Sequence, residues 1–375
     1  MKLPFKQYHL LLILNEFNKQ KAPLDVFSST YFRKNKAIGS KDRKYISNMV
    51  YNMTRWNGLI EYFCTKPITN EKKIKVFENL NISQASQDKT IKEHIRCSFP
   101  EEYYSLIKEE YKDNAIDFCL TSNTKAPTTI RVNLLKTTRD KLFDVFKKNY
   151  KVKKCKFSNF GIIFEEKINF FALKEFKDGL FEIQDEGSQI ISDLINLKKD
   201  DLVLDYCAGS GGKTLAFAHK AQNKGQFFLH DVRSFALKEA KKRLKRASIE
   251  NAQFKNFNDS TLKLLKNKID WLVLDVPCSG SGTLRRNPDM KWKFKKENLD
   301  NLVSLQKEIF DLSFSYVKKG GFIAYFTCSI FSTENENQVK YFLKNYPIKL
   351  DQEIIRLPVT KDGMDGFFAA IFKKL

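Results

Sequence analysis

The sequence predicts an α/β protein whose C-terminal half, residues 181–375, forms a doubly wound domain around a mostly parallel, seven-stranded sheet. A small α+β module over 123–180 and an all-helical domain over 1–122 precede it. Two observations support this division. From residue 181 onward, short apolar runs alternate with segments of helical periodicity, as in parallel strands joined by crossover helices. Before residue 122, apolar residues recur at three- and four-residue steps without strand-like alternation.

The helical domain begins with an amphipathic helix over residues 8–17. A second helix is predicted from about Asp42 to Met53, where Ser40 is a plausible N-cap and the apolar side chains again share one face. Two further helices are predicted over residues 90–97 and 100–120.

The small module follows a polar break at residues 121–127. Its predicted elements are a helix over 137–149 and strands over 128–134, 151–157, 161–165 and 169–173. Residues 126–180 hold 13 Lys+Arg against 6 Asp+Glu and are the most densely positive part of a chain with net charge +22. Such an excess of positive charge indicates a polyanionic partner, most commonly nucleic acid. The alternative is a Lys-rich surface that only keeps the protein in solution. The same segment contains four phenylalanines, Phe157, Phe160, Phe170 and Phe171. We expect most of them to be core residues rather than surface rings on which nucleic-acid bases stack.

The predicted strands of the α/β domain cover residues 202–206, 226–230, 253–256, 271–274, 322–326, about 352–357 and 366–373. The predicted helices cover residues 189–197, 214–221, 234–248, 297–317 and 334–345. In open sheets of this kind, ligands bind in the crevice beyond the carboxyl ends of the strands. Polar residues at those ends are therefore the first candidates for function.

A Gly-rich turn, Asp205–Thr214, connects the first of these strands to the next helix. It is not a P-loop, because Cys207 stands where the first glycine of that motif belongs, and its glycine spacing does not match the dinucleotide motif. Acids follow the next three strands, at Asp231, Asp259 and Asp275. Glycines let main-chain amides approach a ligand, and a strand-end acid can accept both ribose hydroxyls. The ordered set suggests S-adenosylmethionine; a P-loop nucleotidase is the alternative.

The seven cysteines are odd in number and include no C-x-x-C pair, so neither a disulfide framework nor a metal site is expected. Cys278 and Cys328 follow the fourth and fifth predicted strands. If these strands are neighbours, both thiols face the crevice beyond Asp275. A thiolate that attacks carbon 6 of a pyrimidine makes carbon 5 a methyl acceptor, and an acid at nitrogen 3 stabilises the developing charge. The alternative is that either cysteine is a buried structural thiol.

Five groups of motifs occur in order: Arg131–Asn133; Gln184–Ser188; Asp205–Thr214; Asp275–Gly280 with Arg285–Asp289; and Thr327–Ser329. Together they resemble the Sun/Fmu-type (RsmB-like) RNA (cytosine-5) methyltransferases, which are class I, Rossmann-like enzymes that use S-adenosylmethionine. The resemblance spans about residues 131–373. The N-terminal helices are similar to a NusB-like RNA-binding domain, mainly through Ser40–Arg43 and Arg55–Trp56.

The resemblance implies roles for residues at matching positions. Cys328 is the expected nucleophile, Cys278 is expected to assist release of the product, and Asp275 is expected to contact the target base beside the cofactor. The turn departs from the family pattern, which has Ala-Pro-Gly-Gly-Lys where this chain has Gly209–Lys213. The positions that match the cofactor site are Cys207, Ala208, Gly209, Ser210, Gly211, Gly212, Lys213, Asp231, Asp259 and Asp275.

The resemblance also implies methylation of cytosine carbon 5 in RNA, with 16S ribosomal RNA as the expected substrate. A non-catalytic RNA-binding assembly factor that retains the fold is the alternative. The sequence contains neither an apolar run of 18 residues nor a secretory signal pattern, so we expect no membrane partner and a cytoplasmic location. No pattern predicts the oligomeric state, and a monomer is assumed.

Overall fold

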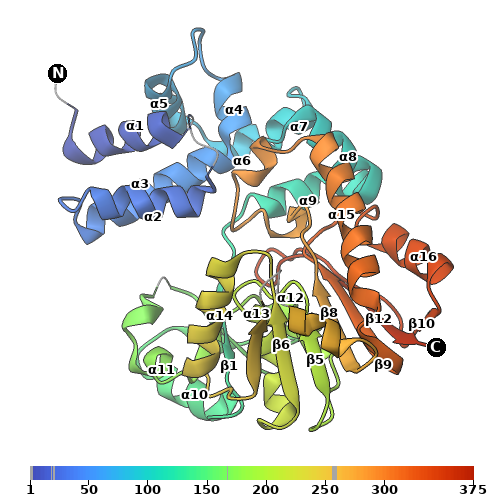
Figure 1. The fold of residues 1–375 in the computed structure, drawn as a ribbon. Coiled ribbons are helices and arrows are strands. Elements are labelled where there is room, and N and C mark those ends of the chain that lie inside the picture. Colours follow the sequence, from blue (N-terminus) through green and yellow to red (C-terminus); the bar gives the residue numbers. More distant parts are fainter. Residues whose placement is uncertain (1–2, 18, 20–21, 167, 256–259) are drawn as a thin grey trace. The chain divides into compact units, whose positions relative to one another are not determined.

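The structure, a computed structural model, describes residues 3–17, 19, 22–166, 168–255 and 260–375 (Figure 1). The chain divides into two compact units. The first unit combines Met1–Lys125 with Thr283–Asn298, and the second combines Ala126–Gly282 with Leu299–Leu375. Each unit has its own hydrophobic core.

The helices of the first unit are α1 (Phe5–Phe17), α2 (Leu24–Lys34), α3 (Ser40–Arg55), α4 (Asn57–Tyr62), α5 (Asn70–Asn79), α6 (Ile82–Ala85), α7 (Glu93–Arg96), α8 (Glu101–Tyr111) and α9 (Ala115–Ser122). The apolar faces of α1 and α3 share one core. Ser40 is the first residue of α3 rather than its predicted N-cap, because Gly39 has the extended backbone of the cap position. The helix predicted over 100–120 is two helices, because Lys112, with φ of +50°, interrupts it.

The segment Thr283–Asn298, which was predicted to belong to the α/β domain, groups with the helical unit instead. The reason is a set of buried polar contacts. The Lys291 ammonium, 1% exposed, donates to the main-chain oxygen of Arg55 at 2.7 Å and to Oδ1 of Asn123 at 2.6 Å. The Arg55 guanidinium in turn donates to the main-chain oxygen of Arg285 at 2.8 Å.

The second unit contains a small antiparallel sheet with the order β2-β3-β1-β4. Its strands are β1 (Thr128–Val132), β2 (Val152–Lys154), β3 (Gly161–Phe164) and β4 (Phe181–Ile183), and its helices are α10 (Arg139–Phe146) and α11 (Lys174–Lys177). Because β4 pairs with β1, this sheet continues past the predicted boundary at residue 180. The strand predicted over 169–173 is a 3-10 turn instead, since Phe170 turns inward to the core. Phe157 and Phe171 are exposed, by 57% and 66%, Phe160 is partly exposed, and only Phe170 is buried, so the prediction that most of the four rings are core residues is wrong.

The larger sheet has eight strands, with seven in the order β10-β12-β9-β8-β5-β6-β7 and β11 paired to β12. Its strands are β5 (Leu202–Asp205), β6 (Gln226–His230), β7 (Ala252–Lys255), β8 (Ile269–Asp275), β9 (Val317–Thr327), β10 (Ile348–Leu350), β11 (Ile355–Leu357) and β12 (Phe367–Lys374). The five strands from β9 to β7 pair in parallel, whereas β10, β11 and β12 add antiparallel pairs. The predicted count of seven is one too few, because the short β10 was not recognised.

Helices cover both faces of this sheet, which is a doubly wound, Rossmann-like arrangement (Figure 1). The helices are α12 (Glu186–Asp193), α13 (Gly212–Phe217), α14 (Ser234–Arg246), α15 (Lys296–Phe314) and α16 (Glu336–Asn345). Side chains of α12, α13 and α14 pack on one face, and side chains of α15 and α16 pack on the other. Strand β8 lies between β5 and β9, so the ends of these three strands meet at one edge. Within the described residues, no helix combines the length and apolar character needed to cross a membrane.

Candidate active site

Two cysteines lie just beyond the carboxyl ends of the neighbouring strands β8 and β9. The Sγ atoms of Cys278 and Cys328 are 3.2 Å apart, and the main-chain N–H of Cys328 points to Sγ of Cys278 at 3.3 Å. Both side chains are half-buried free thiols, and their separation is far longer than a covalent S–S bond of about 2.0 Å. The structure therefore brings together the two thiols that were predicted to share a crevice.

The loops that carry the two cysteines are tied to each other through Gly282. Its main-chain N–H donates to the carbonyl oxygen of Cys328 at 2.9 Å, and its carbonyl oxygen accepts from the N–H of Gly366 at 2.9 Å. A Cβ atom at Gly282 would lie 2.3 Å from the carbonyl oxygen of Gly366. A side chain here would push the loops apart, so this glycine maintains the spacing of the thiols.

A buried acid, Glu334, supports the same loop and was not recognised from the sequence. Its Oε1 accepts hydrogen bonds from the main-chain N–H of Ser279 and from Nε2 of Gln306, each at 2.9 Å, and its side chain is 0% exposed. Ser279 directly follows Cys278, so Glu334 holds the backbone beside that thiol. The only sequence signal for a role of Glu334 is its position shortly after Cys328. That signal is too weak to distinguish this acid from the other acids of the chain.

The pKa of the Cys278 thiol is raised well above its usual range. The main cause is the hydrogen bond with Cys328, followed by burial and by the negative charges of Cys328 and Glu334, each of which favours the neutral thiol. Cys278 therefore keeps its proton at neutral pH and can donate a hydrogen bond to the sulfur of Cys328.

Asp275, the last residue of β8, forms an ion pair with the first turn of α13. Its Oδ2 accepts from the ammonium of Lys213 at 2.9 Å. The Lys213 side chain is 8% exposed, whereas the Asp275 side chain is 36% exposed. The buried lysine thus fixes the acid while leaving part of the carboxylate accessible to a bound molecule.

Asp205, at the end of β5, has an unused hydrogen-bonding position. The carboxylate is 1% exposed, and its Oδ2 accepts from the hydroxyl of Thr214 at 2.7 Å. Its Oδ1 is buried and has no hydrogen-bond partner in the part of the chain that the structure describes. Burial raises the pKa of Asp205 to about 7, and the charge of Asp275 adds to this effect. A ligand that donates a hydrogen bond here would satisfy a costly buried acceptor.

The Gly-rich turn after Asp205 is shaped to let a ligand approach the main chain. Gly209 and Gly211 have φ angles of +52° and +77°, which glycine adopts without strain. A Cβ atom at Gly211 would lie 2.8 Å from Cδ1 of Leu244, whereas one at Gly212 would meet no atom within 4 Å. One side of the turn therefore packs on α14 and the other is open. Together with the unpartnered oxygen of Asp205, this geometry fits a nucleoside-containing ligand with a donor group.

Asp231, just beyond β6, accepts four hydrogen bonds. Its Oδ1 accepts from the main-chain N–H and Nε of Arg233 at 2.8 and 2.9 Å, and its Oδ2 accepts from the N–H of Gly209 at 2.8 Å and Nη2 of Arg233 at 3.0 Å. Burial raises the pKa of Asp231, but the bonds from Arg233 and Gly209 outweigh burial and leave that pKa lowered. The acid predicted to bind ribose is therefore ionised and held by a neighbouring arginine.

The remaining predicted cofactor positions that the structure describes lie in the same turn. Ala208 is buried and its N–H donates to the carbonyl oxygen of His230 at 2.9 Å, which ties the turn to β6. Cys207 lies beside Asp205, and burial raises the pKa of its thiol well above the usual range. Asp259 lies outside the described residues. Among the residues that are described, no three His, Cys, Asp or Glu side chains form a metal-binding group.

Replacing Asp205 with asparagine is expected to stabilise the protein more at pH 8 than at pH 5. The raised pKa means that folded Asp205 holds a proton between pH 3.8, its ordinary value, and about 7, whereas the unfolded chain does not. This contribution to the free energy of unfolding therefore falls as pH rises through that window, by at most about 1.4 kcal/mol per unit. Asparagine does not ionise, so the difference in Tm between variant and wild type should grow from pH 5 to pH 8. A difference independent of pH would contradict the assignment.

Two family models match the chain. One, described as 16S rRNA methyltransferase RsmB/F, matches residues 192–373, and another, described as the RsmF/B-like ferredoxin-like domain, matches residues 99–170. Ribosomal RNA small subunit methyltransferase B of Vibrio vulnificus is 29% identical over 278 residues, which cover 72% of this chain and 65% of that protein. The matched part of the chain thus spans slightly less than two thirds of that relative.

Solved structures with similar folds include two with high coverage. The crystal structure of PH0851 has a TM-score of 0.82 at 21% identity and covers 100% of both chains. A methyltransferase homolog protein from Pyrococcus horikoshii has a TM-score of 0.66 at 25% identity and covers 76% of this chain and 98% of its own. These likenesses agree with the doubly wound sheet described above.

Proposed function

Because this chain belongs to the Sun/Fmu-type family of RNA methyltransferases, we propose that it transfers a methyl group from S-adenosylmethionine to carbon 5 of a cytosine in RNA. The observation that carries the proposal is the pair of sulfurs 3.2 Å apart beyond the adjacent strands β8 and β9. A protein that only bound RNA would need neither thiol at that edge of the sheet.

S-adenosylmethionine is the cofactor, and residues of the second unit fit it. The main-chain amides of the Gly-rich turn, the unpartnered oxygen of Asp205 and the carboxylate of Asp231 would hold it. A buried carboxylate oxygen suits the ammonium of an amino acid, and a strand-end acid suits the ribose. When bound, the cofactor supplies an electrophilic methyl group.

In the proposed mechanism, Cys328 is the nucleophile. Its thiolate forms a bond to carbon 6 of cytosine, and the electrons of the 5,6 double bond make carbon 5 nucleophilic. In its protonated form, the Asp275 carboxyl group, which Lys213 holds in place, donates a hydrogen bond to nitrogen 3 of the base and stabilises the negative charge that develops there. After carbon 5 has accepted the methyl group, a solvent water takes up the carbon-5 proton and the electrons of that C–H bond re-form the 5,6 double bond. The bond between carbon 6 and sulfur then breaks, and its electron pair returns to Cys328. Cys278, which retains its proton, then donates a hydrogen bond to the departing sulfur.

The proposed substrate is small-subunit ribosomal RNA in the cytoplasm. Support comes from the net charge of +22, from the positive segment 126–180, and from the names of relatives that act on that RNA. The small module and the helical unit are proposed to hold the RNA while the target cytosine turns out of its stack into the active site.

The function is tested by incubating the purified protein with radiolabelled S-adenosylmethionine and ribosomal RNA, both free and in small subunits. Label in RNA that migrates as 5-methylcytosine after digestion is the expected result. Bisulfite sequencing of RNA from cells without this protein would then identify the lost site. RNA binding without label transfer would favour the assembly factor that only retains the fold.

Replacing Arg233 with alanine is expected to tighten binding of S-adenosylhomocysteine about two- to fivefold. The Arg233 side chain uses one acceptor position on each oxygen of Asp231, which are the positions that a ribose diol needs. The Arg233 side chain is 57% exposed, so its ion pair with Asp231 is weak and its removal should increase the affinity only modestly. Calorimetric titration measures it, with Asp231→Asn as the control that weakens binding. Weaker binding by Arg233→Ala would mean that this arginine contacts the ligand instead.

A further inference from the structure

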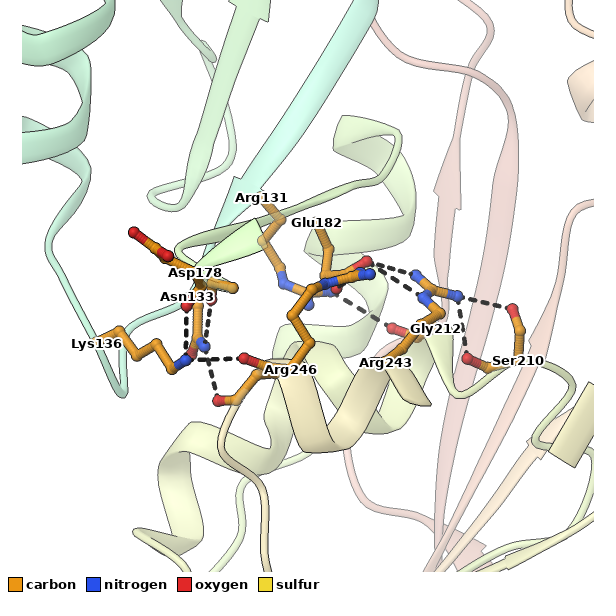
Figure 2. Close-up of polar contacts among 11 residues, drawn as sticks. Arg131, Asn133, Lys136, Asp178, Glu182, Ser210, Gly212, Arg243 and Arg246 are labelled. Carbon is orange, nitrogen blue, oxygen red and sulfur yellow. Dashed lines mark hydrogen bonds and ion pairs between the residues drawn. The ribbon is translucent and has the colours of Figure 1, made fainter. Parts of the chain in front are cut away.

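The Gly-rich turn is held from outside by an arginine on α14. Nη1 of Arg243 donates to the hydroxyl of Ser210 at 2.7 Å and to its carbonyl oxygen at 3.0 Å (Figure 2). Ser210 occupies the position at which the Sun/Fmu-type family has proline, whose ring fixes the backbone φ angle covalently. Here, Ser210 lies between Gly209 and Gly211, both with positive φ. A serine between two glycines has more conformational freedom than a proline, so its position depends on an external contact.

Arg243 is itself fixed by an acid of the small sheet. Its Nε and Nη2 donate to Oε2 of Glu182 on β4, at 3.2 and 3.0 Å. The Glu182 side chain is only 5% exposed, and its Oε1 accepts from Nη2 of Arg246 (Figure 2). The Arg243 side chain is 18% exposed. A mostly buried pair with hydrogen bonds at both ends of the guanidinium has little freedom to move.

The C-terminal end of α14 is anchored to the same module. Nδ2 of Asn133 donates to the carbonyl oxygen of Ala247 at 2.9 Å, and Nζ of Lys136 donates to that of Arg246 at 2.8 Å (Figure 2). These bonds satisfy carbonyl groups at the end of the helix that have no partner within it. They keep α14, and hence Arg243, in a constant position relative to β4.

The main chain of the turn is also held from the small sheet, at Gly212. The carbonyl oxygen of Gly212 accepts from Nη1 of Arg131 on β1 at 3.4 Å and from Nε2 of Gln184 at 3.2 Å. Arg131 also donates to Oε1 of Gln184. The small module therefore contacts Gly212 directly and reaches Ser210 through Arg243, so it supports two points of the ligand-binding turn.

We propose that Arg243, oriented by Glu182, is a positioning residue that holds the Gly-rich turn in its ligand-binding conformation and thereby couples cofactor affinity to the small module. The proposal rests on the proposed function, because it takes the turn to be the cofactor site. Arg243 acts through Ser210 and does not touch the reacting atoms. In this chain, the contact takes over the restraint that proline supplies in the family pattern.

The test compares Arg243→Gln with Arg246→Gln. Both variants remove an ion pair with Glu182, but only Arg243 contacts the turn through its side chain. Calorimetric titration with S-adenosylhomocysteine should show about tenfold weaker binding for Arg243→Gln, the loss expected for hydrogen bonds from a charged group, and unchanged binding for Arg246→Gln. In steady-state assays, KM for the cofactor should rise while kcat at saturation stays constant. Ser210→Ala should have a smaller effect, because the bond to the carbonyl oxygen is retained.

Amide hydrogen exchange without ligand separates this proposal from the proposed function. Arg243→Gln should speed exchange over residues 207–213, and Arg246→Gln should not. Equal changes in the two variants, in exchange or in affinity, would overturn the positioning role. If the wild-type protein does not bind S-adenosylhomocysteine, the proposed function is at fault, and the exchange result still decides whether Arg243 orders the turn.

Discussion

Replacing Cys328 with alanine is expected to abolish methyl transfer, with a loss of roughly 10³-fold or more, because no other group can form the bond to carbon 6. The side chain is half-buried and its sulfur contacts Cys278 at 3.2 Å, so the substitution leaves only a small void. Binding of S-adenosylhomocysteine should therefore be retained. The measurement is transfer of radiolabelled methyl groups to RNA under single-turnover conditions.

Cys64→Ala is a matched control for this experiment. Cys64 is also a half-buried free thiol, but it belongs to the helical unit. Activity should be unchanged in this variant. Methyl transfer by Cys328→Ala at close to the wild-type rate would exclude Cys328 as the nucleophile and, with it, the proposed covalent mechanism.

Replacing Cys278 with alanine is expected to trap a covalent complex between the protein and RNA. Without Cys278, the sulfur of Cys328 loses the thiol that is placed to stabilise it as it leaves carbon 6. Bond formation does not need that thiol, so the adduct should form and then accumulate. Incubation with RNA and S-adenosylmethionine, followed by denaturing electrophoresis, should show a slowly migrating species that contains both protein and RNA.

The double variant Cys278→Ala with Cys328→Ala is the control and should form no such species. The wild-type protein should show little of it, because release is fast. A denaturant-resistant complex with Cys328→Ala, and none with Cys278→Ala, would reverse the roles of the two thiols. The absence of a complex from every variant would refute both assignments.

The alternation of strands and helices could be predicted from the sequence, because apolar periodicity depends on residues that are close along the chain. The run Trp271–Leu274 is buried throughout and ends at Asp275, as its composition indicated. Irregular segments were less predictable. Phe170 is apolar enough for a strand but lies in a 3-10 turn that packs its ring into the core of the small module. The segment Thr283–Asn298 could not be assigned to the helical unit, since its contacts there are with residues more than 150 positions away.

For the candidate site, the sequence by itself determined the order of the chemical groups: a Gly-rich turn after Asp205, an acid at Asp231, and Asp275 with Cys278 followed by Cys328. Only the tertiary structure decided which atoms meet. The order of strands β5, β8 and β9 brings two sulfurs 50 residues apart to within 3.2 Å. The tertiary structure also shows that Glu334 holds the backbone beside Cys278 and that Arg243 holds the Gly-rich turn. No local sequence pattern had marked either residue. The physical reason is that a hydrogen bond requires partners within about 3 Å, and such distances between remote residues are set by packing rather than by local sequence.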